Sequence, residues 1–458
     1  MQLLPILTAL ALTCVSAPTL AQRTAPRPVP PPRPVRPPNV VLLVADDLGY
    51  RDLGVQGMRD IATPNIDRLA REGVRFTDGY MVSSLCSPSR AGILTGRYPE
   101  RWGQELNPGR TVPSDSAFGI PQSQPLLSER LKSLGYATGI FGKWHEGYRP
   151  ANLPMARGFD DFVGFLGPAQ AYRQGWIPFR YSKLQRGTQL VRERSFLTDA
   201  FAREAVRFID QRAAHPFFLY VPFNAVHEPM IDDEARIKRV SSIQDPKRRR
   251  YASILIGMDD AVGQILGALD RHGLTDNTLV FFVSDNGGPT QVTTSSNAPL
   301  RGVKGNLYEG GIRVPFIVRW PGRVPAGARY SLPVSALDVA ATTVAAVGGP
   351  CCADFDGVDL LPFIRGERGA AVPHQRLFWR MDQEVAVRDG QWKLVSMAGN
   401  ASLYDLQTDI AEAKDVAQLH PDIVQRLTRA SGEWASQMQP PKWGLANFRR
   451  RRGTSDEH

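Results

Sequence analysis

The chain has 458 residues, of which 42% are apolar, enough for the core of one large domain or of two unequal ones. Its formal net charge is +10, but the arginines of residues 1–36 and the basic last ten residues account for much of it and leave about +4 for the core. This weak charge excludes the basic surface of a nucleic-acid-binding protein and is compatible with an anionic substrate.

The first 38 residues are predicted to lie outside the folded domain. Residues 1–21 are an apolar run that ends in small residues, which is typical of a secretory signal peptide cleaved after Ala21. A lipoprotein anchored at Cys14 is the less favoured alternative, and the run is too short for a membrane anchor. Residues 22–38 are rich in Pro and Arg, which predicts an extended linker. We therefore expect an exported protein, periplasmic or secreted, with no integral membrane segment.

The first buried strand is predicted at residues 40–45. Its continuous run of Val, Leu and Ala is typical of a strand that is covered on both faces. Asp46 and Asp47 follow directly. Ligands of open parallel sheets bind at the carboxyl ends of the strands, so this pair of carboxylates is expected at a binding edge.

The next informative segment is Ser84–Gly96. Pro88 is predicted in the first turn of a helix that Gly96 ends, which puts Cys86 at the positive end of the helix dipole and Arg90 one turn further in. A cationic environment of this kind lowers the pKa of a thiol. The other cysteines lie in the leader or next to each other and do not indicate a disulfide framework.

Three more strands are each followed by polar residues. The strand predicted at 136–141 precedes Lys143 and His145, the strand at 216–221 precedes His227, and the strand at 279–284 ends in Asp285-Asn286. A loop with regularly spaced glycines then carries Lys304. Because parallel strands end at a common edge, we expect these side chains to share one pocket with the aspartate pair.

The remaining pattern predicts an α/β fold with a large, mostly parallel central sheet flanked by helices, and a smaller C-terminal antiparallel sheet plus helix. We expect a catalytic domain at 39–349, a C-terminal subdomain at 350–440 and a basic tail at 441–458. Residues 165–194 are predicted to form a long loop. Helices are predicted at residues 63–73, 124–134, 201–213, 251–271, 335–347 and 421–438, and further strands at 74–77, 314–320 and in four short runs between 376 and 406.

Two motifs resemble the signatures of a known family. Residues 86–96 read C-S-P-S-R-A-G-I-L-T-G, and residues 135–145 read G-Y-A-T-G-I-F-G-K-W-H. They are similar to the two signatures of the sulfatases, the formylglycine-dependent, Cys-type, arylsulfatase-like branch of the alkaline phosphatase superfamily. Phe141 and Glu146 depart from the family pattern, which has a smaller residue and a leucine there. Glu146 lies beside the expected site and bears on substrate choice.

The resemblance implies that a formylglycine-generating maturation enzyme oxidises Cys86 to an aldehyde, which works as its hydrate. It also implies a bound Ca²⁺. Three aspartates and an asparagine are hard oxygen ligands, which suit Ca²⁺ or Mg²⁺ better than Zn²⁺. The implied metal site consists of Asp46, Asp47, Cys86, Asp285 and Asn286.

The resemblance further implies a mechanism. One hydroxyl of the hydrate attacks the sulfur of a sulfate ester, and His227 and Lys304 bind the sulfate and protonate the leaving alcohol. His145 takes the proton of the second hydroxyl, which expels sulfate. Lys143 and Arg90 stabilise the hydrate and the developing negative charge.

The expected function is therefore hydrolysis of sulfate monoesters, with a sulfated carbohydrate or a small-molecule sulfate ester as substrate. One alternative is a phosphodiester or phosphonate monoester hydrolase of the same superfamily. Another is an inactive binder of sulfated glycans, if Cys86 is not matured. The substrate side is expected to be shaped by residues 102–123, 165–194 and 289–300.

Overall fold

The computed structural model describes residues 36–108, 118–173, 181–350 and 353–443. The chain divides into two units, residues 1–36 and 37–458, and only the second is described in detail. The predicted signal peptide with Cys14, most of the predicted linker, Cys351, Cys352 and the tail beyond residue 443 lie outside the described residues.

A ten-stranded sheet forms the centre of the second unit. Its strands are β1 (Asn39–Ala45), β2 (Val74–Phe76), β4 (Ala137–Lys143), β5 (Asp161–Phe165), β6 (Gln185–Arg186), β7 (Gln189–Leu190), β8 (Phe217–Pro222), β9 (Thr278–Ser284), β10 (Phe316–Arg319) and β11 (Ala328–Tyr330). They lie in the order β11-β2-β10-β9-β1-β8-β4-β5-β6-β7. The five strands from β9 to β5 are parallel, whereas β10 is antiparallel to both of its neighbours. The predicted mostly parallel sheet is confirmed.

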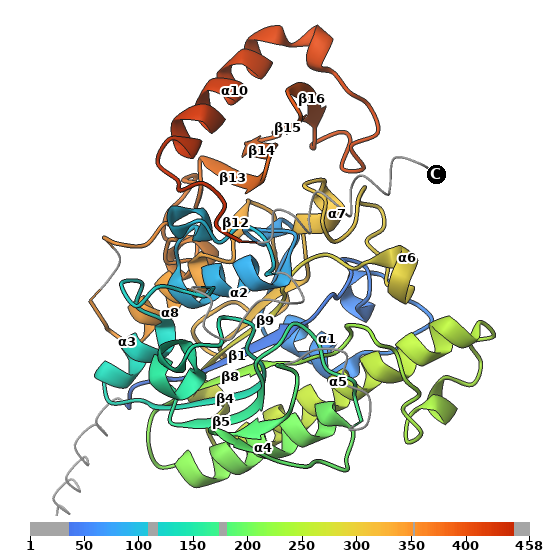
Figure 1. The fold of residues 1–458 in the computed structure, drawn as a ribbon, viewed down its shortest axis with the longest axis vertical. Helices are drawn as coiled ribbons and strands as arrows, with labels where there is room; N and C mark the ends of the chain where they lie inside the picture. The colour runs from blue at the N-terminus through green and yellow to red at the C-terminus, as the bar shows by residue number, and fades with distance from the viewer. Residues whose placement is uncertain (1–35, 109–117, 174–180, 351–352, 444–458) are drawn as a thin grey trace, which may run out of the picture. The chain divides into compact units, whose positions relative to one another are not determined.

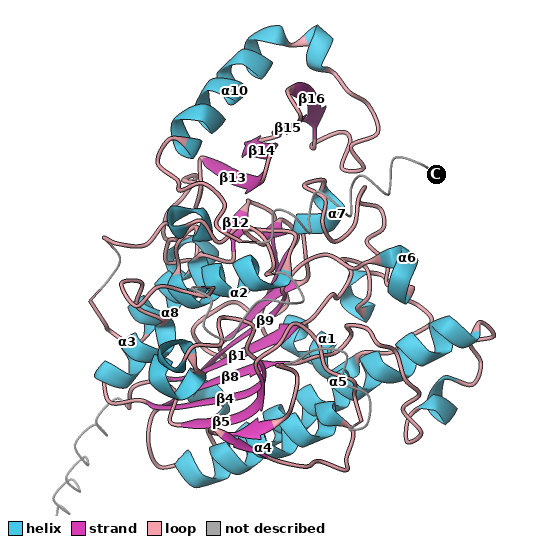
Figure 2. Cartoon of the chain, in the orientation of Figure 1, coloured by secondary structure: helices cyan, strands magenta, loops and turns pink. Residues whose placement is uncertain are grey.

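Helices cover both faces of this sheet (Figures 1 and 2). Alternate residues of β1 point to opposite faces, and every one of them is buried. One face packs against α1 (Pro64–Arg71), α4 (Leu197–Arg212) and α5 (Pro246–Arg271). The other packs against α2 (Cys86–Thr95), α3 (Leu127–Ser133) and α8 (Asp338–Ala346). Short elements complete this part: α6 (Thr290–Thr293), α7 (Glu309–Ile312), α9 (Leu361–Ile364) and the strand pair β3 (Gly79–Tyr80) and β12 (Val334–Ser335).

The C-terminal region forms the predicted antiparallel sheet plus helix. Its elements are β13 (Arg376–Met381), β14 (Glu384–Asp389), β15 (Trp392–Met397), β16 (Asn400–Asp405) and α10 (Pro421–Ala435). One face of the sheet packs against α10 through Leu427, and the other packs around Tyr80 and Ile312. Lys393 of β15 is fully buried and pairs with Glu309 of α7 and with Glu412, both at 2.9 Å. Apolar and ionic contacts thus join the C-terminal sheet to β3 and α7.

Some predicted boundaries are wrong. Helix α3 begins at Leu127 rather than at residue 124, because Pro125 disfavours a helical residue before it and Glu129 caps the Leu126 N–H at 2.7 Å. Helix α5 begins at Pro246 rather than at 251, since Asp245 accepts a hydrogen bond from the Lys247 N–H at 2.9 Å.

The prediction of a long loop at 165–194 is also only partly correct. Strand β5, which the sequence analysis did not predict, runs into it, and β6 and β7 form a short antiparallel ribbon that extends the sheet edge. Helix α5 is long and apolar enough to cross a membrane by length and composition alone, but 78% of its apolar window is buried inside the protein. This burial favours a core helix.

Candidate active site

The carboxyl ends of β1, β4, β8 and β9 meet at one edge of the sheet. In register, Ala45 at the end of β1 lies beside Ser284 of β9, and Val44 lies beside Pro222 of β8. Backbone hydrogen bonds continue past the strand ends: the Asp46 N–H donates to Ala225 O at 2.8 Å, and the Asp285 N–H donates to Ala45 O at 3.0 Å. The loops that carry the predicted site residues are therefore held side by side.

Helix α2 brings Cys86 to this edge. It begins at Cys86 after the extended residue Leu85 and ends at Gly96, whose φ of 69° is left-handed, as predicted for a glycine cap. The side chain of Asn107 accepts a hydrogen bond from the Ser87 N–H at 3.0 Å, which satisfies one free donor of the first turn. The Sγ atom of Cys86 lies 3.7 Å from Oδ1 of Asp46.

The surroundings of Cys86 do not activate its thiol. Burial raises the pKa of the Cys86 thiol to about 12, and the opposing effect of Lys143 and Lys304 is smaller. The negative charges of Asp285 and Asp46 act in the same direction as burial. At neutral pH the side chain is therefore a protonated thiol, which is a poor nucleophile.

Arg90 and Lys143 pair with two of the predicted carboxylates, and all four side chains are fully buried. The Arg90 guanidinium donates from Nε and from a terminal nitrogen to Oδ2 of Asp285 at 3.0 and 2.8 Å. Its other terminal nitrogen donates to Lys143 O at 3.1 Å. The Lys143 ammonium contacts both carboxylate oxygens of Asp46, at 2.8 and 3.1 Å. Burial and the neighbouring carboxylate of Asp46 raise the pKa of Asp285 to about 6.

Asp47 is the centre of a second group. Lys304 Nζ lies 2.6 Å from Oδ1 of Asp47, the Asn286 amide donates to the same oxygen at 2.7 Å, and His227 Nε2 lies 3.5 Å from Oδ2. Burial opposes ionisation, but the surrounding cations outweigh it and lower the pKa of Asp47. Burial would also lower the pKa of Lys304, yet Asp47 raises it well above its ordinary value.

The two histidines differ in their surroundings. His145 has a φ of 66°, is fully buried, and neither of its ring nitrogens has a hydrogen-bond partner among the described residues. Burial and then Lys143 and Arg90 lower its pKa well below the ordinary value, so the ring is neutral. The His227 Nδ1 lies 2.5 Å from the carbonyl oxygen of Glu228, which can only accept, so Nδ1 carries the proton and Nε2 faces Asp47.

The residues present fit a bound cation. The possible ligand atoms of Asp46, Asp47, Cys86 and His227 lie within 4.8 Å of one another. Oδ1 of Asn286 is buried and has no hydrogen-bond partner among the described residues, which suits a metal ligand. The three carboxylates of the site are matched by three cationic side chains, so a divalent ion would make the site positive overall.

The structure thus places all the predicted catalytic and metal-binding residues together, and their roles stay predictions. It also adds Gln104, which the sequence analysis did not single out within the segment 102–123. Gln104 donates from its amide to Ser87 Oγ at 2.8 Å and to Glu146 Oε2 at 2.6 Å, which ties the start of α2 to the segment after His145. Gln104 lies in a stretch without periodicity, so only the tertiary contacts reveal it.

Comparisons with known proteins agree with the motifs. The sulfatase family model matches residues 38–349, and the model of the N-sulphoglucosamine sulphohydrolase C-terminal region matches residues 303–430. N-acetylgalactosamine-6-sulfatase of Sus scrofa is 37% identical over 407 residues, which are 83% of this chain and 74% of the relative. Human arylsulfatase A is 35% identical over 432 residues, 86% of this chain and 82% of the relative.

A solved structure is similar over nearly the whole described chain. The crystal structure of Ps i-CgsB in complex with k-i-k-neocarrahexaose has a TM-score of 0.83 and 36% sequence identity, and it covers 89% of this chain and 95% of its own. The family match, the identity to the relatives and the shared fold lead to one conclusion: the chain belongs to the sulfatase family and is a sulfuric ester hydrolase.

Proposed function

We propose that this protein hydrolyses sulfate monoesters of a sulfated glycan, with a formylglycine derived from Cys86 and with bound Ca²⁺. The observation that carries the proposal is the position of Cys86, which is buried at a helix start beside carboxylates and cations from the ends of β1, β4 and β9. A buried, protonated thiol has little use as a nucleophile. Oxidation to a hydrated aldehyde would supply oxygen nucleophiles at the same position.

The substrate class is proposed from the relatives. N-acetylgalactosamine-6-sulfatase is named for a sulfated sugar, and Ps i-CgsB was solved with a carbohydrate bound. A largely buried site that is positive once the cation is bound would strengthen the binding of an anionic sulfate group. We therefore expect this enzyme to accept a sulfated sugar as well as simple aryl sulfates.

The metal is proposed to be held by Asp46, Asp47, Asp285 and Asn286, next to residue 86. A bound Ca²⁺ would polarise the sulfate group and offset its charge. Arg90 and Lys143 hold Asp285 and Asp46 in place through their buried ion pairs. Mg²⁺ offers the same chemistry, and a calcium-against-magnesium titration distinguishes the two ions.

Sulfate binding and the proton transfers are proposed to use three side chains. His145 is neutral and has free ring nitrogens, so it can take the proton of a hydroxyl on residue 86. Lys304 is charged and lies against Asp47, and it can bind the sulfate and deliver a proton to the leaving alcohol. The His227 ring donates from Nδ1 to Glu228, which directs Nε2 into the site and fixes its orientation.

Maturation and export belong to the same proposal. Residues 1–21 are proposed to direct export to the periplasm or the medium, and a formylglycine-generating enzyme is the partner that converts Cys86. Because Cys86 is fully buried in the folded protein, this conversion is expected before or during folding.

The test is the mass of the peptide that carries Cys86, taken from protein made in a host with a maturation enzyme, together with the hydrolysis of 4-nitrophenyl sulfate. We expect the aldehyde or its hydrate, with activity that is lost in the Cys86→Ala variant. An unmodified thiol with full activity would refute the formylglycine. A matured residue with no hydrolysis of any sulfate ester would refute the proposed reaction, and binding without hydrolysis would support a glycan binder.

A further inference from the structure

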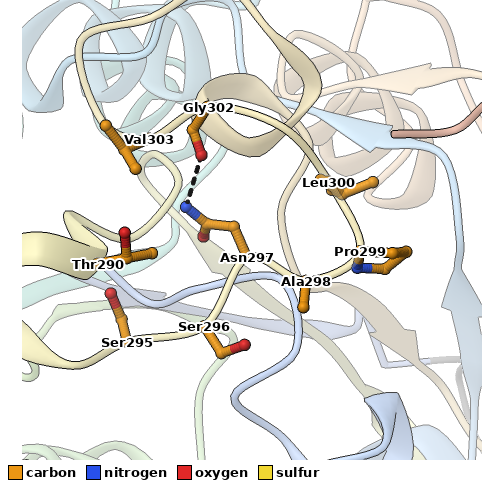
Figure 3. A pocket seen from close by; sticks show the side chains of 9 residues that line it. All are labelled: Thr290, Ser295, Ser296, Asn297, Ala298, Pro299, Leu300, Gly302 and Val303. Atoms are coloured by element: carbon orange, nitrogen blue, oxygen red, sulfur yellow. Dashed lines mark hydrogen bonds between the residues drawn. The ribbon is translucent and has the colours of Figure 1, made fainter. Parts of the chain in front are cut away.

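A cavity of about 450 Å³ opens beside the loop that leads from Asn286 to Lys304. It is lined by nine residues between Thr290 and Val303 (Figure 3). Binding sites for small molecules and sugars have volumes of this order. The cavity plays no part in the proton transfers or the metal site described above.

Ser295 and Ser296 of the cavity lining pack against two loops of the candidate active site. A Cβ atom on Gly288 would lie 2.3 Å from Ser295 Oγ, and one on Gly49 would lie 2.5 Å from the backbone oxygen of Ser296. Each of these glycines comes two residues after a predicted metal ligand, and Val303 directly precedes Lys304. The absence of side chains at both glycines therefore allows the cavity to lie close to the reacting groups.

Asn297 holds this arrangement in place. Its buried amide donates to Gly288 O at 2.8 Å and to Gly302 O at 3.2 Å, and its oxygen accepts from the Gly288 N–H at 2.9 Å. Figure 3 shows the side chain of Asn297 reaching across to Gly302. These three hydrogen bonds hold the two ends of the 288–302 segment together, so the cavity lining has a defined shape next to Lys304.

The lining has the chemistry of a neutral sugar site. None of its residues is charged. Thr290, Ser295 and Ser296 lie to one side in Figure 3, and Ala298, Pro299 and Leu300 lie to the other. The hydroxyls of Thr290 and Ser296 form no hydrogen bond with other described residues. A sugar ring likewise presents hydroxyls at its edge and apolar C–H groups on its faces, whereas a sulfate group requires cations.

We propose that this cavity is a subsite for a neutral sugar unit adjacent to the sulfated sugar of a glycan substrate. The inference rests on the proposed function for the identity of the glycan, but not for the existence of the subsite. A subsite of this kind would make the enzyme bind oligosaccharides more tightly than a small aryl sulfate, which has no second sugar.

The test fills the cavity and compares ligands of different size. Thr290→Trp places bulk in the lining, and Val292→Trp is the matched control, because Val292 lies on the same short helix, is 46% exposed and does not line the cavity. Binding is measured by calorimetry with protein from a host that lacks the maturation enzyme, in which no substrate is turned over. The probes are k-i-k-neocarrahexaose, a keratan tetrasaccharide that is sulfated only on its N-acetylglucosamine units and so presents neutral galactose neighbours, and 4-nitrophenyl sulfate.

At least one oligosaccharide is expected to bind about tenfold more tightly than 4-nitrophenyl sulfate, and Thr290→Trp should remove this advantage while Val292→Trp retains it. Equal loss in both variants, unchanged oligosaccharide binding in Thr290→Trp, or no preference for any oligosaccharide would overturn the subsite. If Thr290→Trp does not fold, Ala298→Phe fills the cavity from its other side. Failure of the proposed reaction appears separately, as a matured protein that binds these ligands but hydrolyses none.

Discussion

Replacing Arg90 by methionine should destabilise the protein strongly, because Arg90 is a fully buried cation with two carboxylate neighbours. Its guanidinium donates twice to Asp285 and once to the backbone of Lys143, and it lies 3.8 Å from Asp46. Methionine matches the length of the side chain and avoids a large cavity. The variant therefore isolates the loss of the charge and of its hydrogen bonds.

The expected magnitude follows from the burial. Breaking a buried ion pair by removing one partner costs about 3 to 5 kcal/mol, because the other charge stays buried without compensation. An exposed pair costs at most about 1 kcal/mol. Arg239 provides the matched control, since its pair with Asp260 at 2.6 Å is formed by a side chain that is 49% exposed.

The assay is urea unfolding of the Arg90→Met and Arg239→Met variants at pH 7.5 with a chelator present, so that metal binding does not contribute. We expect Arg90→Met to lower the free energy of unfolding by about 3 kcal/mol or more and Arg239→Met by less than about 1 kcal/mol. Adding Asp285→Asn to Arg90→Met removes the unpaired charge and should restore at least about 1 kcal/mol. Equal losses in the two single variants, or strictly additive losses in the double variant, would refute this account of the buried pair.

Three further predictions concern other parts of the chain. Burial lowers the pKa of His374, but Asp338, 2.7 Å from its Nε2, outweighs burial and raises the pKa above 6.5. The ion pair therefore stabilises the protein below pH 6.5, and this stabilisation is lost as the pH rises through the raised pKa. In urea unfolding, His374→Gln should cost more stability at pH 5.5 than at pH 9, and an equal cost would contradict this. Asn297→Ala leaves the buried backbone N–H and C=O of Gly288 without their partner and should cost about 1 to 3 kcal/mol and lower aryl sulfate hydrolysis, whereas Asn277→Ala, at an exposed hydrogen bond, should do neither. Ca²⁺ added at about 1,000 times its Kd should stabilise the metal-free protein by about 4 kcal/mol in thermal unfolding. The same stabilisation of the Asp47→Asn variant would exclude Asp47 as a ligand.

The order of elements and the position of the site follow largely from local sequence. The uninterrupted apolar run of β1 predicts a strand buried on both faces, and its end at Asp46 predicts a polar binding edge. Helix α2 begins and ends where Pro88 and Gly96 indicate. These features depend on backbone preferences and hydrophobic periodicity, which are properties of short stretches of sequence.

Other boundaries depend on contacts that short stretches do not contain. Strand β5 has only five residues and includes a glycine, and its pairing with β4 stabilises it in the sheet. The start of α5 depends on the Asp245 cap, which the run of basic residues after it obscured. Strand β10 is as apolar and buried as β9 next to it, so its sequence does not reveal that it runs antiparallel to β9.

The sequence by itself determined which residue types are present at the site and the family to which they point. The tertiary structure decided their chemical state. Cys86 has cationic neighbours, yet burial raises the pKa of its thiol, because desolvation depends on everything packed around the side chain. It also decided which residues support the site. Gln104 joins the start of α2 to the segment after His145, and Asn297 holds the two ends of the 288–302 segment together; these hydrogen bonds exist only once the chain has folded.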